Sequence, residues 1–354
     1  MSVHVPLSDI VAEKKAGGPR RIAIVTDAWA PQVNGVVRTL RATIGELEAR
    51  GHTVLVISPD RFASLPCPTY PEIRLALATR WQVGQLLDAF GPSAVHIATE
   101  GPLGLAARRH CRRRGWRFTT AYHTQFPAYV AKRTHLPERW FWRYVRWFHA
   151  PAEQVMVATA SIRAELAAHG MTRVHGWSRG VDLEQFTARA LPPPEFADLP
   201  RPILLYVGRV AVEKNIEAFL DTRYVGTKVV VGDGPALAAL KARYPAVHFL
   251  GARSGAELAG CYTGADVLVF PSRTDTFGLV MIEALACGTP VAALPVAGPI
   301  DIVTDAVGAL SFDLARAIDA ALFCTRADCA ALGASYSWAA ATDQFLAGLA
   351  DCTA

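Results

Sequence analysis

The chain has 354 residues, which suggests two domains by length alone. Hydrophobic residues make up 51% and charged residues 19%, so the composition excludes a disordered chain and supports a large buried core. The formal net charge of +5 suits a nucleotide diphosphate, an anionic membrane surface or nucleic acid as partner. No apolar run approaches the roughly 18–20 residues of a membrane span. Residues 1–20 lack the apolar core of a signal peptide, so we do not expect secretion.

The seven cysteines are irregularly spaced and show no metal-type C-x-x-C pairing. An odd number of cysteines without a regular framework is typical of a reducing compartment. The cysteine pattern therefore predicts a cytoplasmic protein.

The first half of the chain predicts one parallel β-sheet. Residues 1–20 are polar, basic and glycine-containing, which indicates a loose tail. Residues 22–26 and 53–58 are short buried strands, and residues 36–50 between them have helical spacing that ends at Gly51. This β-loop-α-β opening is typical of a parallel sheet. Further strands are predicted at residues 94–98, 117–121 and 155–158.

A second series of strands and helices follows a proline-rich break. The break is Leu191-Pro192-Pro193-Pro194-Glu195, which predicts a linker. Residues 337–349 form a final amphipathic helix pattern. Two such series predict two doubly wound α/β domains with a ligand cleft between them. The strands of the second series are predicted at residues 202–207, 228–231, 247–250, 267–270 and 290–293.

Two carboxylates separated by seven residues, Asp275 and Glu283, mark the most informative segment. A buried strand precedes them at residues 266–270, and a helix over residues 279–286 ends before Gly288. Open α/β sheets bind ligands at this carboxyl edge. N–H groups at the helix start can face a phosphate, and the carboxylates can accept hydrogen bonds from sugar hydroxyls. The alternative is that Asp275 only caps the helix and Glu283 is solvated.

The segment Ser272 to Val291 resembles the acidic E-x7-E signature of retaining glycosyltransferases with the GT-B fold, family 4 type (glycosyltransferase group 1). Asp275 replaces the first glutamate of that signature. The resemblance covers about residues 20–350. It implies that Asp275 contacts the donor sugar and Glu283 the ribose. The donor site implied by it also includes Phe277, Gly278 and Leu279.

The resemblance also implies the domain organisation. We expect an N-terminal tail over residues 1–20 and an acceptor-side Rossmann-like domain over residues 21–190. A nucleotide-sugar-binding Rossmann-like domain is expected over residues 191–336. The last segment, residues 337–354, is expected to cross back to the first domain, as the final helix does in this family.

A basic loop follows the first strand of the second domain. The segment from Tyr206 to Asn215 resembles the family's G-R-x(4)-K-N loop and supplies Arg209 and Lys214. A departing nucleoside diphosphate develops negative charge that two fixed cations can stabilise. Arg209 can bind a phosphate in bidentate fashion, while Lys214 acts as a point charge. The alternative is a structural arginine and a surface lysine.

Three glycines are candidate donor contacts. Gly232 and Gly234 follow a strand in a segment that flanks the nucleotide in the family, although a plain turn explains them equally well. Gly35 matches the second glycine of a pair that relatives place near the phosphates, and its alternative role is conformational. No G-x-G-x-x-G opens either domain, so the fingerprint of a dinucleotide cofactor is absent.

His123 follows a predicted strand in a segment that resembles the family motif H-T-x-F-P. A lone histidine is usually structural, but in relatives this residue meets the donor sugar, so the resemblance implies a catalytic role. Arg179-Gly180-Val181-Asp182 resembles the family's N-G-V-D segment near the domain junction, with Arg179 where asparagine is usual.

Residues 139–149 are unusually aromatic and basic, and they predict an amphipathic helix. Such a helix can lie on a membrane, whereas the alternative is that its aromatic face is core and its arginines are solvated. The predicted acceptor or membrane contacts are Trp140, Arg143, Tyr144, Arg146 and Trp147. The expected aromatic face consists of Trp140, Phe141, Tyr144, Val145, Trp147 and Phe148. The expected basic face consists of Arg139, Arg143, Arg146 and His149.

Together with these features, the resemblance implies a retaining hexosyltransferase that uses a UDP- or GDP-linked sugar and needs no metal or other cofactor. The absence of an Asp-x-Asp motif agrees with metal independence. The chain also resembles bacterial glycosyltransferases that glycosylate diacylglycerol or phosphatidylinositol or make sulfoquinovosyl lipid. This resemblance implies a membrane lipid such as diacylglycerol as acceptor, with the protein peripheral at the inner face of the cell membrane. One alternative is a mannosyltransferase that acts on a soluble or polysaccharide acceptor. Alternatives of another class are a nucleotide-sugar epimerase or phosphorylase, and a nucleic-acid-binding protein, for which no recognition motif is present.

Overall fold

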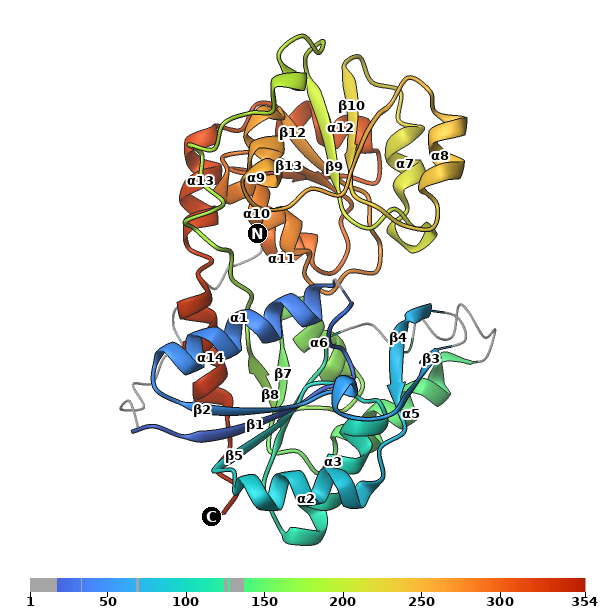
Figure 1. The fold of residues 1–354 in the computed structure, drawn as a ribbon. Coiled ribbons are helices and arrows are strands. Elements are labelled where there is room, and N and C mark those ends of the chain that lie inside the picture. The colour runs from blue at the N-terminus through green and yellow to red at the C-terminus, as the bar shows by residue number, and fades with distance from the viewer. Residues whose placement is uncertain (1–17, 33, 68–69, 124–126, 128–136, 354) are drawn as a thin grey trace.

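The computed structural model describes residues 18–32, 34–67, 70–123, 127 and 137–353. Most of the expected tail, residues 1–17, lies outside the described part. Two α/β domains follow one another along the chain, each built on a six-stranded sheet whose strand pairs are all parallel (Figure 1). The predicted pair of doubly wound domains is therefore confirmed.

The first sheet has the order β2-β1-β5-β6-β7-β8. Its strands are β1 (Arg21–Val25), β2 (Thr53–Ile57), β5 (Ala94–Ile97), β6 (Thr119–Ala121), β7 (Val155–Val157) and β8 (Val174–Gly176). One face is covered by α2 (Arg80–Phe90), α3 (Pro102–Arg114) and α5 (Glu138–His149). Next to the sheet lies an antiparallel pair that the sequence did not predict, β3 (Ser64–Cys67) and β4 (Tyr70–Ala76). The helix α6 (Ala160–Ala168) packs beside β7 and β8.

The second sheet has the order β11-β10-β9-β12-β13-β14, which is the strand order of a Rossmann fold. Its strands are β9 (Ile203–Val207), β10 (Thr227–Val231), β11 (His248–Gly251), β12 (Val267–Phe270), β13 (Val291–Ala293) and β14 (Gly308–Leu310). One face packs against α7 (Ile216–Leu220), α8 (Leu237–Arg243) and α12 (Leu314–Ala321). The other packs against α9 (Gly255–Gly264), α10 (Leu279–Ala286) and α13 (Arg326–Ala334).

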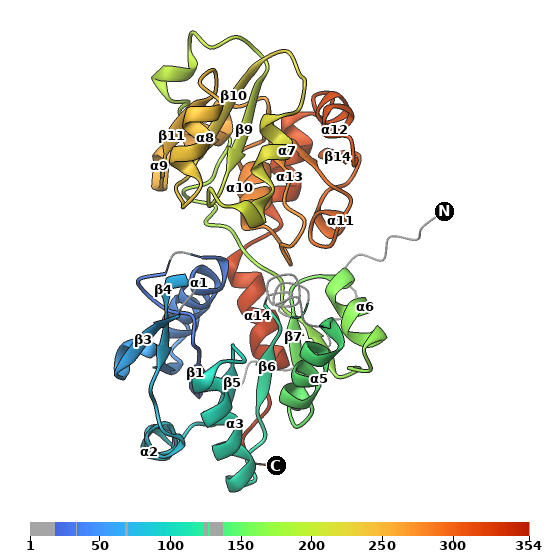
Figure 2. The same cartoon turned by 90° about the vertical axis from the view of Figure 1, so that its right-hand side faces the viewer.

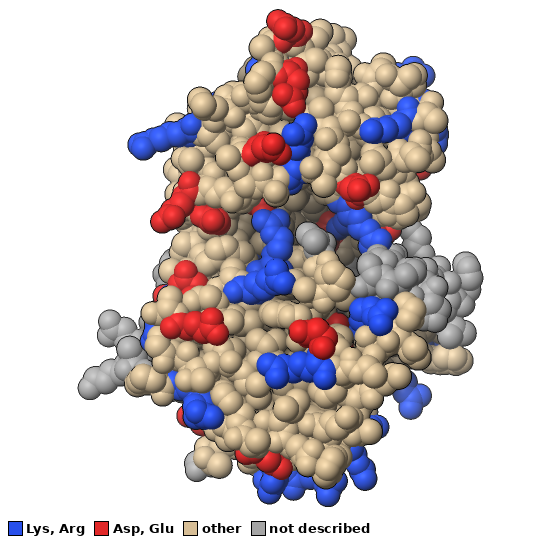
Figure 3. Space-filling model, in the orientation of Figure 1, with Lys and Arg blue, Asp and Glu red and all other residues tan. Residues whose placement is uncertain are grey.

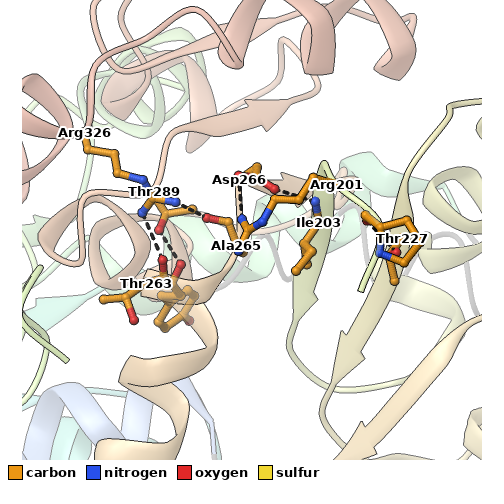
Figure 4. A network of polar contacts seen from close by, with 10 residues as sticks. Arg201, Ile203, Thr227, Thr263, Ala265, Asp266, Thr289 and Arg326 are labelled. Carbon is orange, nitrogen blue, oxygen red and sulfur yellow. Dashed lines mark hydrogen bonds and ion pairs between the residues drawn. The ribbon is translucent and has the colours of Figure 1, made fainter. Parts of the chain in front are cut away.

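A polar network ties the beginnings of the central strands of the second sheet together (Figure 4). The carboxylate of Asp266 accepts hydrogen bonds from Arg201 Nη1 at 2.7 Å and from the backbone N–H of Ile203 at 2.6 Å. Arg326 donates to the carbonyls of Thr263 and Ala265. The network lies where the strands start, so it anchors the sheet at the edge opposite the carboxyl ends of the strands.

The last helix, α14 (Trp338–Gly348), follows the second domain in sequence but packs on the first (Figures 1 and 2). It contacts α1 (Gly35–Ala49), where Arg50 binds Asp343 through a 2.5 Å Nη1–Oδ1 contact. His175 of β8 forms a 2.8 Å hydrogen bond with the carbonyl of Gln344. The chain therefore crosses between the domains twice, which restricts how they can move apart.

Candidate functional site

The carboxyl ends of the two sheets face each other, and hydrogen bonds join them. Thr276, in the loop after β12, donates its hydroxyl to the carbonyl of His123 at the end of β6, at 2.7 Å. Ser161 of α6 donates its backbone N–H to Asp301 of α11 (Pro299–Ile302) at 2.9 Å. On the face shown in Figure 3, Lys and Arg side chains flank the seam between the domains. The loops at the two sheet edges are therefore in direct contact.

The two predicted donor-binding loops meet at the point where the strand order of the second sheet reverses. β9 and β12 are neighbours there, although they are far apart in sequence. Lys214 follows β9, and its Nζ lies 2.6 Å from Oδ1 of Asp275, which follows β12. Asn215 adopts a left-handed conformation with φ 53° and donates its amide to the carbonyl of Pro271 at 2.9 Å, which fixes one loop to the other. The geometry thus brings together residues that the sequence placed 61 positions apart.

Arg209 lies on the same loop as Lys214. Its Nη1 is 3.8 Å from the carboxylate of Glu213, and its carbonyl accepts a 2.8 Å hydrogen bond from the hydroxyl of Tyr206. In this structure each of the two predicted phosphate-binding cations contacts a carboxylate. A diphosphate that binds both cations would compete with Glu213 for Arg209 and with Asp275 for Lys214.

The alternative interpretation of the two acidic residues is wrong. The N-cap of α10 is Gly278, whose φ of 92° suits glycine, and no side chain caps this helix. Glu283 is not solvated, since its side chain is only 2% exposed. Its Oε2 accepts a 2.8 Å hydrogen bond from Tyr262, and its Oε1 pairs with Arg38 of the first domain. The sequence did not predict Arg38 and Tyr262 as site residues. A signal for Arg38 was present, because it lies almost one turn after Gly35 on a helix that starts at the sheet edge.

The three glycines predicted as donor contacts differ in how much space surrounds their Cα atoms. A Cβ on Gly232 would lie 1.8 Å from the carbonyl oxygen of Gly208, and one on Gly234 would lie 2.4 Å from that of Val210. Close backbone approach between the two loops therefore explains both residues, and their donor contacts stay a prediction. Gly35 differs, because its Cβ would only touch Leu279 at 3.7 Å across the domain junction.

Phe277 lies at the loop but its side chain is 5% exposed and packs in the core, edge-on to Tyr336 at 6.0 Å. Only its backbone can face a ligand. His123 is 9% exposed, and its Nδ1 lies 2.9 Å from Nη2 of Arg179. The predicted catalytic residues thus gather where the two sheet edges meet.

The helix α5 forms as predicted, but the expected division into an aromatic and a basic face is wrong. Its buried side chains are Trp142, Val145, Phe148 and His149. His149 can be buried because its Nδ1 forms a 2.8 Å hydrogen bond with Thr120 Oγ1. Tyr144 is half-buried and donates to the carbonyl of Glu100 at 2.5 Å, so it packs against its own domain.

The exposed face of α5 combines both kinds of side chain. Trp140 and Trp147 are 51% and 46% exposed. With 100° per residue, these tryptophans and three exposed arginines share an arc of about 120°. The Arg108 guanidinium of α3 lies 4.0 Å from the Trp147 ring and donates to the Trp147 and Phe148 carbonyls, which fixes the end of α5. We call this surface the Trp–Arg face; it consists of Arg139, Trp140, Arg143, Arg146 and Trp147.

Comparisons with known proteins agree with this geometry. Residues 33–185 match Glycosyltransferase Family 4, and residues 201–324 match Glycosyl transferases group 1. A GDP-mannose-dependent alpha-mannosyltransferase from Mycobacterium tuberculosis is 32% identical over 80% of this chain and 81% of its own length. A sulfoquinovosyl transferase from Arabidopsis thaliana is 30% identical over 86% of this chain and 64% of its own. The sucrose-phosphate synthase structure from Thermosynechococcus elongatus superposes with a TM-score of 0.73 at 22% identity, covering 93% of this chain and 98% of that one.

The fold and the loops at the sheet edges thus define a GT-B glycosyltransferase. The chain belongs to the group 1 and family 4 glycosyltransferases, and it transfers a sugar from a nucleotide-sugar donor to an acceptor. The resemblance seen in the sequence is confirmed. An epimerase, a phosphorylase or a nucleic-acid-binding protein is therefore not the class of this chain.

Asp275→Asn is expected to lower turnover strongly without lowering the melting temperature. The substitution keeps the size of the side chain but removes the charge that pairs with Lys214. Both side chains are about a quarter exposed, so the ion pair contributes little to folding. Steady-state kinetics and thermal melting on the same preparation test this. Reduced stability with normal turnover per folded molecule would show that the carboxylate is structural.

Proposed function

We propose that the protein is a retaining hexosyltransferase that glycosylates a lipid acceptor at an anionic membrane surface. The observation that carries this proposal is the Trp–Arg face, which lies on the acceptor-side domain. Tryptophan suits the boundary between headgroups and acyl chains, and arginine is attracted to anionic lipids. No helix in the described part of the chain is long and apolar enough to cross a bilayer. Contact through a surface helix is therefore the form of membrane association that we infer.

The first domain exposes further arginines. Arg109 and Arg112 are exposed on α3, the helix that holds α5 through Arg108. Relatives support a lipid acceptor by their names, which include an alpha-monoglucosyldiacylglycerol synthase from Streptococcus pneumoniae, 28% identical over 86% of this chain and 79% of its own. The inner face of the cell membrane is the site of action that we propose.

The reaction that we propose is direct transfer with retention of the anomeric configuration and without a metal ion. Arg209 and Lys214 stabilise the charge of the departing diphosphate. Asp275 and His123 contact the donor sugar, and Glu283 contacts the ribose. The acceptor hydroxyl attacks from the side on which the phosphate leaves, so the departing phosphate oxygen can take the hydroxyl proton.

A GDP-mannose donor is the candidate that the relatives favour. The mycobacterial protein described above carries that donor in its name, and so does a relative from Mycolicibacterium smegmatis that is 32% identical over 83% of this chain.

The decisive experiment is a donor panel with vesicles that contain diacylglycerol. Release of nucleoside diphosphate should depend on one sugar nucleotide and on the lipid, and EDTA should not abolish it. NMR of the product should show the same anomeric configuration as the donor. An inverted anomer, or loss of activity with EDTA, would contradict the mechanism. Equal turnover with a soluble sugar acceptor and no lipid dependence would contradict the acceptor.

A further inference from the structure

A buried arginine stands directly behind His123. Arg179 follows β8 and is 6% exposed. Its Nη1 donates to the carbonyls of Trp177 at 2.7 Å and Ser178 at 3.1 Å, and its Nη2 lies 2.9 Å from His123 Nδ1. The guanidinium also stacks over the Trp177 ring at 4.9 Å. No carboxylate in the described part of the chain forms an ion pair with it, so the positive charge is buried without a counter-ion.

This contact determines where the hydrogen of the imidazole is. A guanidinium has donors and no acceptor, so His123 Nδ1 has to be the acceptor. The neutral ring then carries its hydrogen on Nε2. That atom is buried and has no hydrogen-bond partner among the described residues. The protein therefore leaves one N–H donor without a partner at the junction of the two domains.

The charge of Arg179, like its hydrogen bond, favours the neutral form of the His123 ring. Burial lowers the pKa of His123 well below its ordinary value, and the positive charge of Arg179 and the neighbouring His96 lower it further. Burial lowers the pKa of Arg179 itself to about 9, which leaves it protonated at neutral pH. The His96 ring is edge-on to the same Trp177 at 5.5 Å, and burial lowers the His96 pKa to about 3. Both histidines are thus neutral.

We propose that Arg179 is a positioning residue for sugar transfer, which holds His123 neutral with its hydrogen on Nε2 so that the ring donates one fixed hydrogen bond to an oxygen of the donor sugar. This inference rests on the proposed contact between His123 and the sugar. It also excludes His123 as the general base. A ring held in this form has no free nitrogen to take the proton of the acceptor hydroxyl. An asparagine at the same position could present either its N–H or its oxygen to the ring, and would not fix the tautomer.

The tautomer can be observed directly in the full-length protein. Two-bond ¹H–¹⁵N correlation spectra of histidine-labelled protein report which ring nitrogen carries hydrogen, and His123→Gln assigns the signal. We expect hydrogen on Nε2 alone, without protonation between about pH 5 and pH 8. A wild-type ring with hydrogen on Nδ1, or one that becomes charged in this range, would overturn the proposal.

Three substitutions, one of them a control, test how the His123 ring depends on Arg179. Arg179→Met removes both the hydrogen bond and the charge; it should release the tautomer, raise the His123 pKa and lower kcat by roughly 10- to 100-fold, the range found where a partner that orients a metal-bound histidine is removed. Arg179→Gln removes the charge and supplies an amide that can donate or accept, so it should allow both tautomers and raise the pKa of His123. Arg189→Met, on an exposed residue of the same domain, is the matched control. Affinity for the nucleoside diphosphate should not change in any of them.

The two possible failures are distinguishable. If Arg179→Met kept the wild-type ring spectrum and rate, the positioning role would be wrong. If Arg179→Met did not fold, the spectra of the wild-type protein and of Arg179→Gln would still test the positioning role. If His123→Gln retained full activity while the wild-type ring carried hydrogen on Nε2, the proposed sugar contact would fail and the tautomer assignment would stand.

Discussion

Lys214→Ala is expected to lower kcat by roughly 10²–10³-fold, the size of effect found when a preorganised group that stabilises transition-state charge is removed. The reason is the position of Lys214 at the switch point of the second sheet, 2.6 Å from Asp275 and on the same loop as Arg209. The diphosphate of the donor is already charged, and further negative charge develops on it as the glycosidic bond breaks. Loss of the ammonium should therefore affect kcat more than the affinity for the donor, which steady-state kinetics and nucleotide titration can separate.

Controls distinguish catalysis from stability in this experiment. Lys241→Ala removes an exposed lysine from α8 of the same domain and should leave the rate unchanged. Arg209→Lys keeps the charge but loses the planar fork, so it should also be costly. Because the Lys214–Asp275 pair is partly exposed, its loss should cost no more than about 1 kcal/mol of folding free energy. Wild-type rates in both Lys214→Ala and Arg209→Lys would mean that the phosphate clamp is misassigned.

Elements with a strong apolar signal were predictable almost to the residue. The run Val267–Phe270 is fully apolar and forms β12, and α10 begins and ends where the pattern and Gly288 indicated. Two strands at the sheet edges were missed, β8 and β14. Each has three residues, includes a glycine and is largely half-buried, so neither shows a buried apolar run or a clear alternation. The β3–β4 pair was missed as well: its register is interrupted between Pro66 and Cys67, and proline weakens a strand pattern.

The candidate site was predictable where a strand end alone determines the position of a residue. Arg209, Lys214 and Asp275 each follow a strand of the second sheet, whose order brings them together, and His123 follows β6 of the first sheet. The contacts across the domain junction were not predictable. The ion pair between Arg38 and Glu283 joins residues 245 positions apart, and the contact between Arg179 and His123 joins residues 56 apart. No local pattern indicates such partners, because they depend on how two separately folded domains meet.

The helix α5 shows a different limit. Its periodicity predicted a helix, but two arcs were apolar enough to be buried, one centred on Val145 and one that includes the two exposed tryptophans. The structure buries the first because Trp142 stacks on His169 at a ring separation of 3.6 Å and His149 finds polar partners inside. The orientation therefore followed from neighbouring elements and not from the helix itself.

Binding to anionic vesicles is expected to require the Trp–Arg face and to weaken as the salt concentration rises. Each basic residue near an anionic surface contributes about 1 kcal/mol, so Arg139, Arg143 and Arg146 together contribute on the order of 3 kcal/mol, or about a hundredfold in partitioning at low salt. The structure strengthens this expectation, because Trp140 and Trp147 share the exposed arc and can insert beside the arginines. Flotation with vesicles of increasing anionic lipid content, at low and high salt, measures both dependences.

Two sets of substitutions test which surface binds the membrane. Replacing the three arginines of the face by glutamine should release the protein from anionic vesicles yet leave its melting temperature and donor binding unchanged, since all three are exposed. Replacing Arg189, Arg223 and Arg316 by glutamine removes the same charge elsewhere and should not release it. Trp140→Ala should weaken binding at any salt concentration, because apolar insertion is not screened by ions. If the wild-type protein ignores anionic vesicles at low salt, or if both triple variants lose binding equally, the Trp–Arg face is not the membrane contact, and a soluble acceptor becomes the better proposal.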